Sequence, residues 1–161
     1  MTEISLSEKI EEAWQRRSAL HADPSTTAYR IFCGHSEGLP GLNIERFGDT
    51  AVLYCHRPVT STQLEVVAET LGRCFAPSRI ILKEKMKTGL SSPEACGRVF
   101  QGEVLEASLE VLDNGLRFLI DPLLTPNVGL FLDARPARAW LMENSRGRRV
   151  LNCFAYTGSL G

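Results

Sequence analysis

The amino-acid sequence predicts a mixed α/β fold, and three observations support that prediction. Short apolar segments bounded by glycine-containing turns recur along residues 29–121, as they do in sheets built from short strands. Two segments, residues 7–20 and 61–75, instead repeat their apolar residues at helical spacing. Residues 150–154 form an apolar run that enters a glycine-containing turn, which is typical of the first, central strand of a doubly wound sheet.

The first half of the chain begins with a helix that leads into a sheet. Ser5 or Ser7 is placed to cap the helix over residues 7–20, and the hydroxyl-rich segment 22–27 is a linker. The strands that follow are expected at residues 29–33, 42–47 and 51–56. Gly48-Asp49 is suited to a tight hairpin between the last two. A second helix over residues 61–75 and a strand over residues 79–85 complete this half.

The second half contains a hairpin, a helix and the final apolar run. Asn114-Gly115, the pair favoured by a type I′ turn, separates two predicted strands at residues 109–113 and 116–121. A loop over residues 124–129 follows. Asp133 is a suitable N-cap for a helix that ends near Asn144, because Pro136 is tolerated only in a first helical turn.

The composition is that of an ordinary globular domain. The 161 residues are 43% hydrophobic and 23% charged, and the formal net charge of −1 gives no general attraction to nucleic acid, so any RNA contact must use local basic patches. The first twenty residues carry neither a signal-peptide core nor a membrane-spanning stretch, and we expect a cytoplasmic protein without membrane contact. Five cysteines without C-x-x-C spacing predict reduced thiols and no metal site.

Four ordered blocks of sequence resemble a known family. They are GHSEGLPGLNIERFGD at residues 34–49, DNGLRFLID at 113–121, GLFLDAR at 129–135 and VLNCFAYTG at 150–158. Together they resemble the large-subunit rRNA cytosine-5 methyltransferases over residues 29–161. The resemblance implies a class I methyltransferase with S-adenosylmethionine as cofactor and with rRNA or another RNA as substrate. It also implies that the chain ends just after the first cofactor motif. Members of the family usually carry an RNA-binding PUA domain at the N-terminus, whereas only a helix and a linker are expected before residue 29 here.

The resemblance divides the chain into four expected parts. Residues 1–27 are an N-terminal helix and linker, and residues 28–107 are an α/β substrate-recognition domain. Residues 108–128 are a connecting β-hairpin and loop, and residues 129–161 hold the first helix and strand of a truncated Rossmann-like methyltransferase domain. Such a piece is expected to be inactive alone and able to self-associate through its open sheet.

The candidate cofactor-binding residues lie in the last two blocks. They are Phe131, Asp133, Arg135, Asn152, Phe154, Tyr156, Thr157 and Gly158. Glycine at 158 lets the backbone approach a ligand closely, and Arg135 is a suitable partner for the methionine carboxylate. Asp133 can equally be a helix N-cap, and Arg135 and Arg138 can equally form a solvated helix face.

The catalytic residues are not identified and are expected beyond Gly161, where the family has its catalytic cysteine. Cys153 is predicted to be buried in a strand rather than nucleophilic, and His35 and His56 to have surface or packing roles. Lys83, Lys85 and Lys87 share a strand face that could contact RNA phosphates or simply protect an exposed sheet edge.

Two other functions remain open. One is a non-catalytic RNA- or ligand-binding α/β module. The other, less favoured, is a dinucleotide dehydrogenase, because the final turn supplies only G-x-x-G and not G-x-G-x-x-G.

Overall fold

A five-stranded sheet forms the centre of the structure, a computed structural model that describes residues 5–85, 96–106, 108–123, 127–153 and 155–160. The strands are β1 (Ala28–Cys33), β2 (Leu42–Phe47), β3 (Thr50–Cys55), β4 (Arg79–Glu84) and β5 (Arg98–Gly102), and they lie side by side in that order. β3 and β4 are parallel, because a helical crossover joins them, and the other neighbours are antiparallel.

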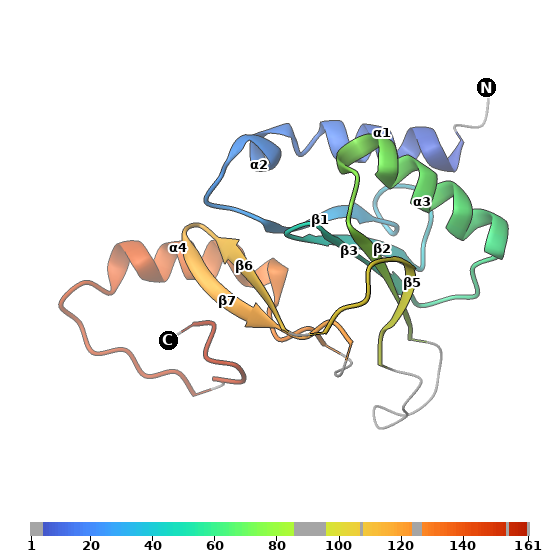
Figure 1. The fold of residues 1–161 in the computed structure, drawn as a ribbon. Coiled ribbons are helices and arrows are strands. Elements are labelled where there is room, and N and C mark those ends of the chain that lie inside the picture. The colour runs from blue at the N-terminus through green and yellow to red at the C-terminus, as the bar shows by residue number, and fades with distance from the viewer. Residues whose placement is uncertain (1–4, 86–95, 107, 124–126, 154, 161) are drawn as a thin grey trace.

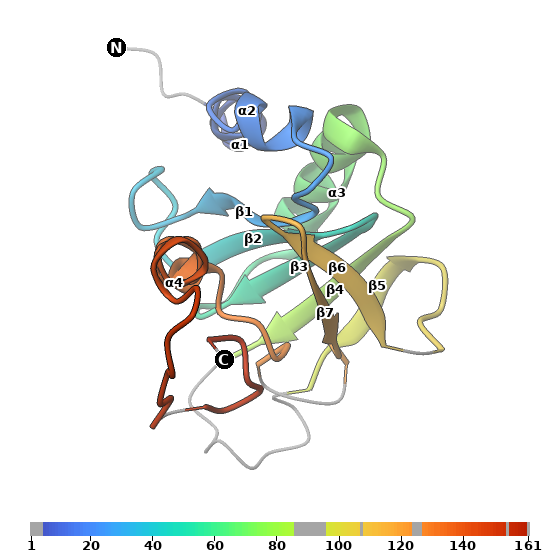
Figure 2. The same cartoon turned by 90° about the vertical axis from the view of Figure 1, so that its left-hand side faces the viewer.

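Helices cover one face of this sheet (Figures 1 and 2). They are α1 (Leu6–Gln15), the short α2 (Ser18–Ala22) and α3 (Ser61–Phe75). Capping boxes start α1 at Ser5 and α3 at Thr60, which satisfies backbone N–H groups that have no partner within the helix. The apolar sides of α1 and α3 pack on the sheet around Ile44 and Leu53. The expected first helix is therefore correct in place but is broken near Arg17, the N-cap of α2.

A β-hairpin packs on the opposite face of the sheet. It is formed by β6 (Leu109–Asp113) and β7 (Leu116–Ile120), as the sequence predicts. Asn114 and Gly115 both have positive φ, 50° and 79°, which a type I′ turn requires. Val111 and Ile120 pack with sheet residues such as Phe47, Val52 and Ile81 in a second apolar cluster. The hairpin and the helices thus sandwich the sheet, and the predicted α/β fold class is confirmed.

Three expectations for the sheet are corrected. The sequence pattern did not reveal β5, which is short and largely exposed. Because β5 pairs with β4, β4 is an inner strand, and the interpretation of its lysines as protection for a sheet edge is wrong. Lys83 is fully buried and does not present its ammonium group to RNA, while Lys87 lies outside the described residues.

The segment after the hairpin consists of a 3-10 turn, Leu132–Ala134, and helix α4 (Arg135–Asn144). Ala134, not Asp133, occupies the N-cap of α4 and makes no side-chain cap hydrogen bond, so the N-cap interpretation of Asp133 is wrong. Pro136 does lie in the first turn of the helix.

The expected strand over residues 150–154 is absent from the part of it that the structure describes, residues 150–153. Leu151 is 86% exposed, and Cys153 is exposed rather than buried. A strand needs a hydrogen-bonded neighbour, and none of the described strands pairs with this segment. Within the described ranges, no helix is long and apolar enough to cross a membrane.

Candidate substrate and cofactor site

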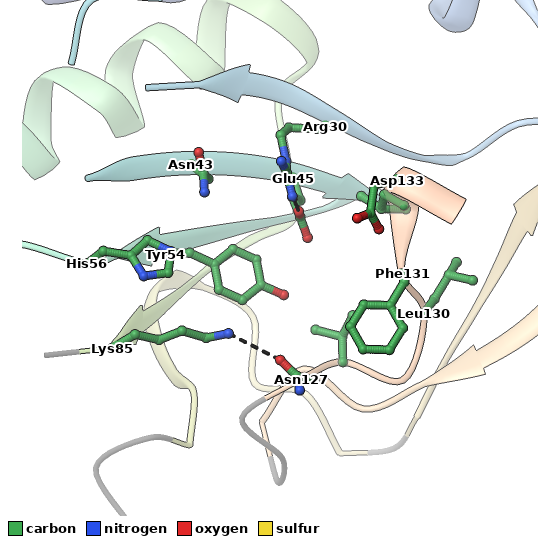
Figure 3. A pocket seen from close by; sticks show the side chains of 12 residues that line it. Arg30, Asn43, Glu45, Tyr54, His56, Lys85, Asn127, Leu130, Phe131 and Asp133 are labelled. Carbon is green, nitrogen blue, oxygen red and sulfur yellow. Dashed lines mark hydrogen bonds and ion pairs between the residues drawn. The ribbon is translucent and has the colours of Figure 1, made fainter. Parts of the chain in front are cut away.

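A polar cleft of about 220 Å³ lies between the sheet and the segment that leads into α4 (Figure 3). The wall on the sheet side is formed by Arg30, Asn43, Glu45, Tyr54, His56 and Lys85. The opposite wall includes Asn127, Leu130, Phe131 and Asp133. Register explains why the sheet residues meet, because Arg30 is paired with Glu45 across β1 and β2, and Asn43 with Tyr54 across β2 and β3.

An ion pair between Arg30 and Glu45 occupies the sheet side of the cleft. Arg30 donates to Glu45 Oε1 from Nη2 at 2.8 Å and from Nε at 3.1 Å. Glu45 is only 6% exposed, and burial raises the pKa of its carboxyl group above the ordinary value, although Arg30 opposes the shift. The pKa of Tyr54 is also raised, mainly by burial and to a smaller extent by the charge of Glu45, so Tyr54 stays a neutral phenol.

Lys85 forms the second cationic side of the cleft. Its Nζ donates to Asn127 Oδ1 at 3.2 Å and lies 4.8 Å from the centre of the Tyr54 ring, within cation–π range. Burial lowers the pKa of Lys85. The pKa of His56 is lowered too, first by burial and then by Lys85 and Arg30, which favours a neutral imidazole.

The predicted cofactor residues are split between this cleft and its surroundings. Phe131 and Asp133 line the cleft, and the ring of Tyr156 lies against Phe131 with the centroids 5.4 Å apart. Tyr156 thereby connects the final turn to the cleft. Asn152 lines neither this cleft nor the neighbouring hollow, and Phe154 lies outside the described residues.

A larger hollow of about 650 Å³ lies between β7, α4 and the final turn. Thr157 and Gly158 line it, together with Gly129 and apolar residues such as Phe118 and Leu141. The Thr157 hydroxyl donates to the Gly129 carbonyl at 2.6 Å, which joins the two sequence blocks. Gly158 has φ of 79° and no atom within 4 Å of where a Cβ would stand, so its backbone is open to a ligand.

Arg135 and Arg138 are not a solvated helix face, and that interpretation is wrong. Both guanidinium groups contact Asp113, at the end of β6, which is 1% exposed. Arg138 donates from Nε to Asp113 Oδ2 at 2.6 Å and from Nη1 to the Phe131 carbonyl at 2.9 Å. Arg135 also donates to the Ala28 carbonyl at 3.3 Å. Sequence reasoning missed this three-residue clamp and the Glu45 side of the cleft. Polar side chains at alternate positions of β2, Asn43 and Glu45, were the available signal.

The fold is that of an α/β protein in which a five-stranded sheet and a hairpin precede a segment with an accessible glycine turn. A family model described as S-adenosylmethionine-dependent methyltransferase matches residues 68–161, and the chain belongs to this family. The family assignment made from the sequence blocks is therefore confirmed. In the part of the chain that the structure describes, no group of three or more His, Cys, Asp or Glu residues could hold a metal ion.

Curated relatives point in the same direction. The chain is 31% identical over 154 residues to the ribosomal RNA large subunit methyltransferase I of Erwinia tasmaniensis, and the match covers 93% of this chain. It is 30% identical over 155 residues to the protein of the same name from Yersinia pseudotuberculosis. In both cases the chain spans only 38% of the relative's length.

Solved structures support the fold. A structure described as an S-adenosylmethionine-dependent methyltransferase from Streptococcus mutans superposes with a TM-score of 0.83, at 20% identity, and covers 99% of this chain and 42% of its own. A second methyltransferase structure, in complex with SAH, superposes with a TM-score of 0.84 at 20% identity. At this identity the likeness establishes the fold alone.

Proposed function

We propose that this chain provides substrate recognition and the first cofactor-binding segment for methyl transfer from S-adenosylmethionine to a base of RNA, with ribosomal RNA as the substrate. The observation that carries the proposal is the contact between Phe131 in the polar cleft and Tyr156 in the final turn, because it brings the cleft next to the segment to which the proposal assigns cofactor binding. The names of the curated relatives support rRNA as the substrate class. Their work on ribosomal RNA also favours a cytoplasmic location.

The larger hollow fits part of such a cofactor. Its volume lies within the usual range for small-molecule sites, about 300–1,000 Å³. Thr157 and Gly158 would hold the cofactor there through backbone and hydroxyl groups, and Tyr156, Phe131 and Asp133 would border its reactive end. When bound, S-adenosylmethionine supplies a sulfonium methyl group for transfer to a nucleophilic atom of the base. The same proposal includes Asn152 and Phe154, which precede these residues in the sequence.

Arg135 has a different contribution in this proposal. Its Nε donates to Asp113 and its Nη2 to the Ala28 carbonyl, so its guanidinium group already has partners. We therefore include Arg135 as a residue that holds the 3-10 turn carrying Asp133 in place, and a carboxylate contact would require it to change partners.

A non-catalytic RNA-binding module is the second candidate. The observation that favours it is the absence of strand pairing at residues 150–153, since a cofactor turn normally follows a strand held in a sheet. On this reading the sheet and the cleft bind RNA, and chemistry plays no part.

Methyl transfer distinguishes the two candidates. The chain can be joined at residue 161 to the remaining sequence of the Erwinia relative, and incubated with labelled S-adenosylmethionine and unmodified large-subunit rRNA. We expect label in the RNA, and loss of label when Gly158 is replaced by valine. Unlabelled RNA with a folded, cofactor-bound chimaera would leave only the binding module.

A further inference from the structure

A histidine ring holds the short helix α2 against the rest of the protein (Figure 1). None of the residues of α2, Ser18–Ala22, is buried, and its N-cap makes no side-chain cap hydrogen bond. Leu20 packs on the core between the helices and the sheet, and His21 stacks on Trp14 of α1 with the ring centroids 3.5 Å apart. The His21 ring also lies 5.6 Å from that of Tyr29, on β1. The attachment of α2 therefore depends largely on one titratable side chain.

The rings that His21 touches already interact with a cation. The guanidinium carbon of Arg46, on β2, lies 5.7 Å from the centre of the Tyr29 ring and 6.0 Å from that of the Trp14 ring. Arg46 donates to the Gly48 carbonyl at 2.7 Å and to the Tyr29 hydroxyl at 2.8 Å, and both acceptors are uncharged. A positive charge on His21 would share the same π-faces with Arg46 and would be repelled by it.

One nitrogen of His21 lies in a position that suits only the neutral ring. Its Nε2 atom is buried and has no hydrogen-bond partner among the described residues. A neutral imidazole tolerates this arrangement, because its proton can reside on Nδ1 and leave Nε2 as a bare acceptor. The imidazolium carries a proton on both nitrogens and would place an unpaired N–H donor at the buried position. Burial, followed by the charges of Arg46 and Arg17, accordingly lowers the pKa of His21.

The groups around the ring stack carry either a positive charge or none. They are Arg17 at the start of α2, Arg46 on β2, the hydroxyl of Tyr29 on β1, Trp14 on α1 and Phe75 on α3. Burial raises the pKa of Tyr29, which stays a neutral phenol. Glu37 pairs with Arg16 and Arg17, each at 2.8 Å, rather than with His21. A proton on His21 therefore finds no compensating anion among these groups.

We propose that His21 is a pH-operated latch, which holds residues 18–24 on the protein while its ring is neutral and releases them when the ring is protonated. The latched segment has fixed ends. Arg17 donates from Nε to a carbonyl of β1 at 2.7 Å, and the Ser25 carbonyl accepts from the Gly115 N–H at 2.9 Å. The opening is therefore local, and the sheet, the hairpin and the cleft stay in place. The latch does not depend on the proposed methyl transfer.

Proton linkage gives the direction of the response. In the open segment His21 has the ordinary pKa of about 6.5, and in the closed segment its pKa is lower. Between these two values the open form binds more protons than the closed one. The ratio of open to closed forms should therefore rise as the pH falls, by up to about tenfold per pH unit. Above about pH 7 the ring is neutral in both forms and the ratio is constant.

Trp14 can report on the latch in the 161-residue chain. The chain has two tryptophans, so Trp140→Phe leaves Trp14, which is 9% exposed, as the only one. We expect its emission to shift to longer wavelength between about pH 7.5 and about pH 5, because departure of His21 admits water to the indole. Hydrogen–deuterium exchange, corrected for the intrinsic effect of pH, should be about tenfold faster at residues 18–24 at the lower pH and unchanged in α3.

Two variants separate the charge of His21 from its ring. His21→Phe keeps a stacking ring that cannot titrate, so emission and exchange should stay those of the closed form at both pH values. His21→Gln removes the ring and should show the open form at both. Matched controls are His35→Gln, at an exposed position, and His56→Gln, in the cleft, and both should keep the pH response. Circular dichroism would verify folding, and His21→Phe decides the test if His21→Gln unfolds the chain.

Three results would overturn the inference. The first is an unchanged Trp14 spectrum together with unchanged exchange at residues 18–24 across this pH range. The second is a full pH response in His21→Phe, which would assign the response to another group. The third is a titration midpoint of the His21 ring protons, measured by NMR, at or above about 6.5, because protonation would then not favour the open form.

Discussion

Replacing Asp113 should destabilise the protein more than replacing an exposed charged residue does. The Asp113 carboxylate is 1% exposed and forms ion pairs with two arginines, of which Arg138 is only 2% exposed. Removing it leaves a buried guanidinium group without its counter-ion, and breaking a buried pair in this way costs about 3–5 kcal/mol. We expect Asp113→Ala to lower the free energy of unfolding by about 3 kcal/mol or more.

The same hairpin provides a matched control. Glu110 and Arg117 pair across β6 and β7 at 3.4 Å, but both side chains are more than half exposed. Glu110→Ala should therefore cost less than about 1 kcal/mol. Urea unfolding followed by circular dichroism would measure both, with the stability change read from the midpoint at constant m-value.

Two results would refute this reasoning. One is a loss in Asp113→Ala no larger than in Glu110→Ala, which would mean that solvent reaches the arginines. The other concerns a rescue: replacing Asp113 and Arg138 together by leucine and methionine should recover part of the loss, because only Arg135, whose side chain is 19% exposed, then lacks its counter-ion. If the double variant is as unstable as Asp113→Ala, the cost comes from packing rather than from the uncompensated charge.

Three further predictions follow from single features. Burial lowers the pKa of Lys83 to about 8, so above that pH the unfolded chain binds more protons than the folded one. The free energy of unfolding should therefore rise between pH 8 and 9, by up to about 1.4 kcal/mol per pH unit. Urea titrations would measure this rise relative to a Lys83→Met variant. Calorimetry should detect negligible S-adenosylmethionine binding by the 161-residue chain but clear binding by the chimaera. Gly158→Val should weaken that binding, whereas Gly147→Val, also at a positive φ but outside the hollow, should not. Tight binding by the short chain would show that the site is misplaced. Limited proteolysis should leave a resistant fragment near residues 29–121, and early cleavage inside residues 42–56 would contradict the proposed recognition domain.

Local chemistry explains which elements could be predicted from the sequence. β2 and α3 were predicted to the residue, and the hairpin nearly so, because Asn114-Gly115 determines its turn and a capping box starts the helix. β5 could not be recognised, because its half-exposed residues lack apolar alternation and its pairing with β4 supplies its order. The apolar run at 150–153 shows the reverse, since hydrophobicity alone does not make a strand when no described neighbour pairs with it.

The candidate site depends on contacts between distant residues, which a single sequence does not encode visibly. The cleft exists because register places Arg30 opposite Glu45 and Asn43 opposite Tyr54, and a slip by one residue would turn Glu45 to the helix-covered face. The Asp113 clamp joins residues 22 and 25 positions apart. From the sequence, the arginines suggested a cofactor contact or a solvated surface, because their acidic partner is remote along the chain.

The clamp also connects the stability of the hairpin to the cleft. Arg138 donates to Asp113 from one side of its guanidinium group and to the Phe131 carbonyl from another, so the buried ion pair fixes the backbone of Phe131, which lines the cleft. Asp113 itself does not line the cleft. If the cleft takes part in binding RNA, as proposed above, Asp113→Asn should therefore weaken the binding of single-stranded RNA at temperatures where the variant is still folded, whereas Glu110→Ala should not. Unchanged binding in a folded Asp113→Asn variant would mean that Phe131 keeps its position without the clamp, and that Asp113 contributes to stability alone.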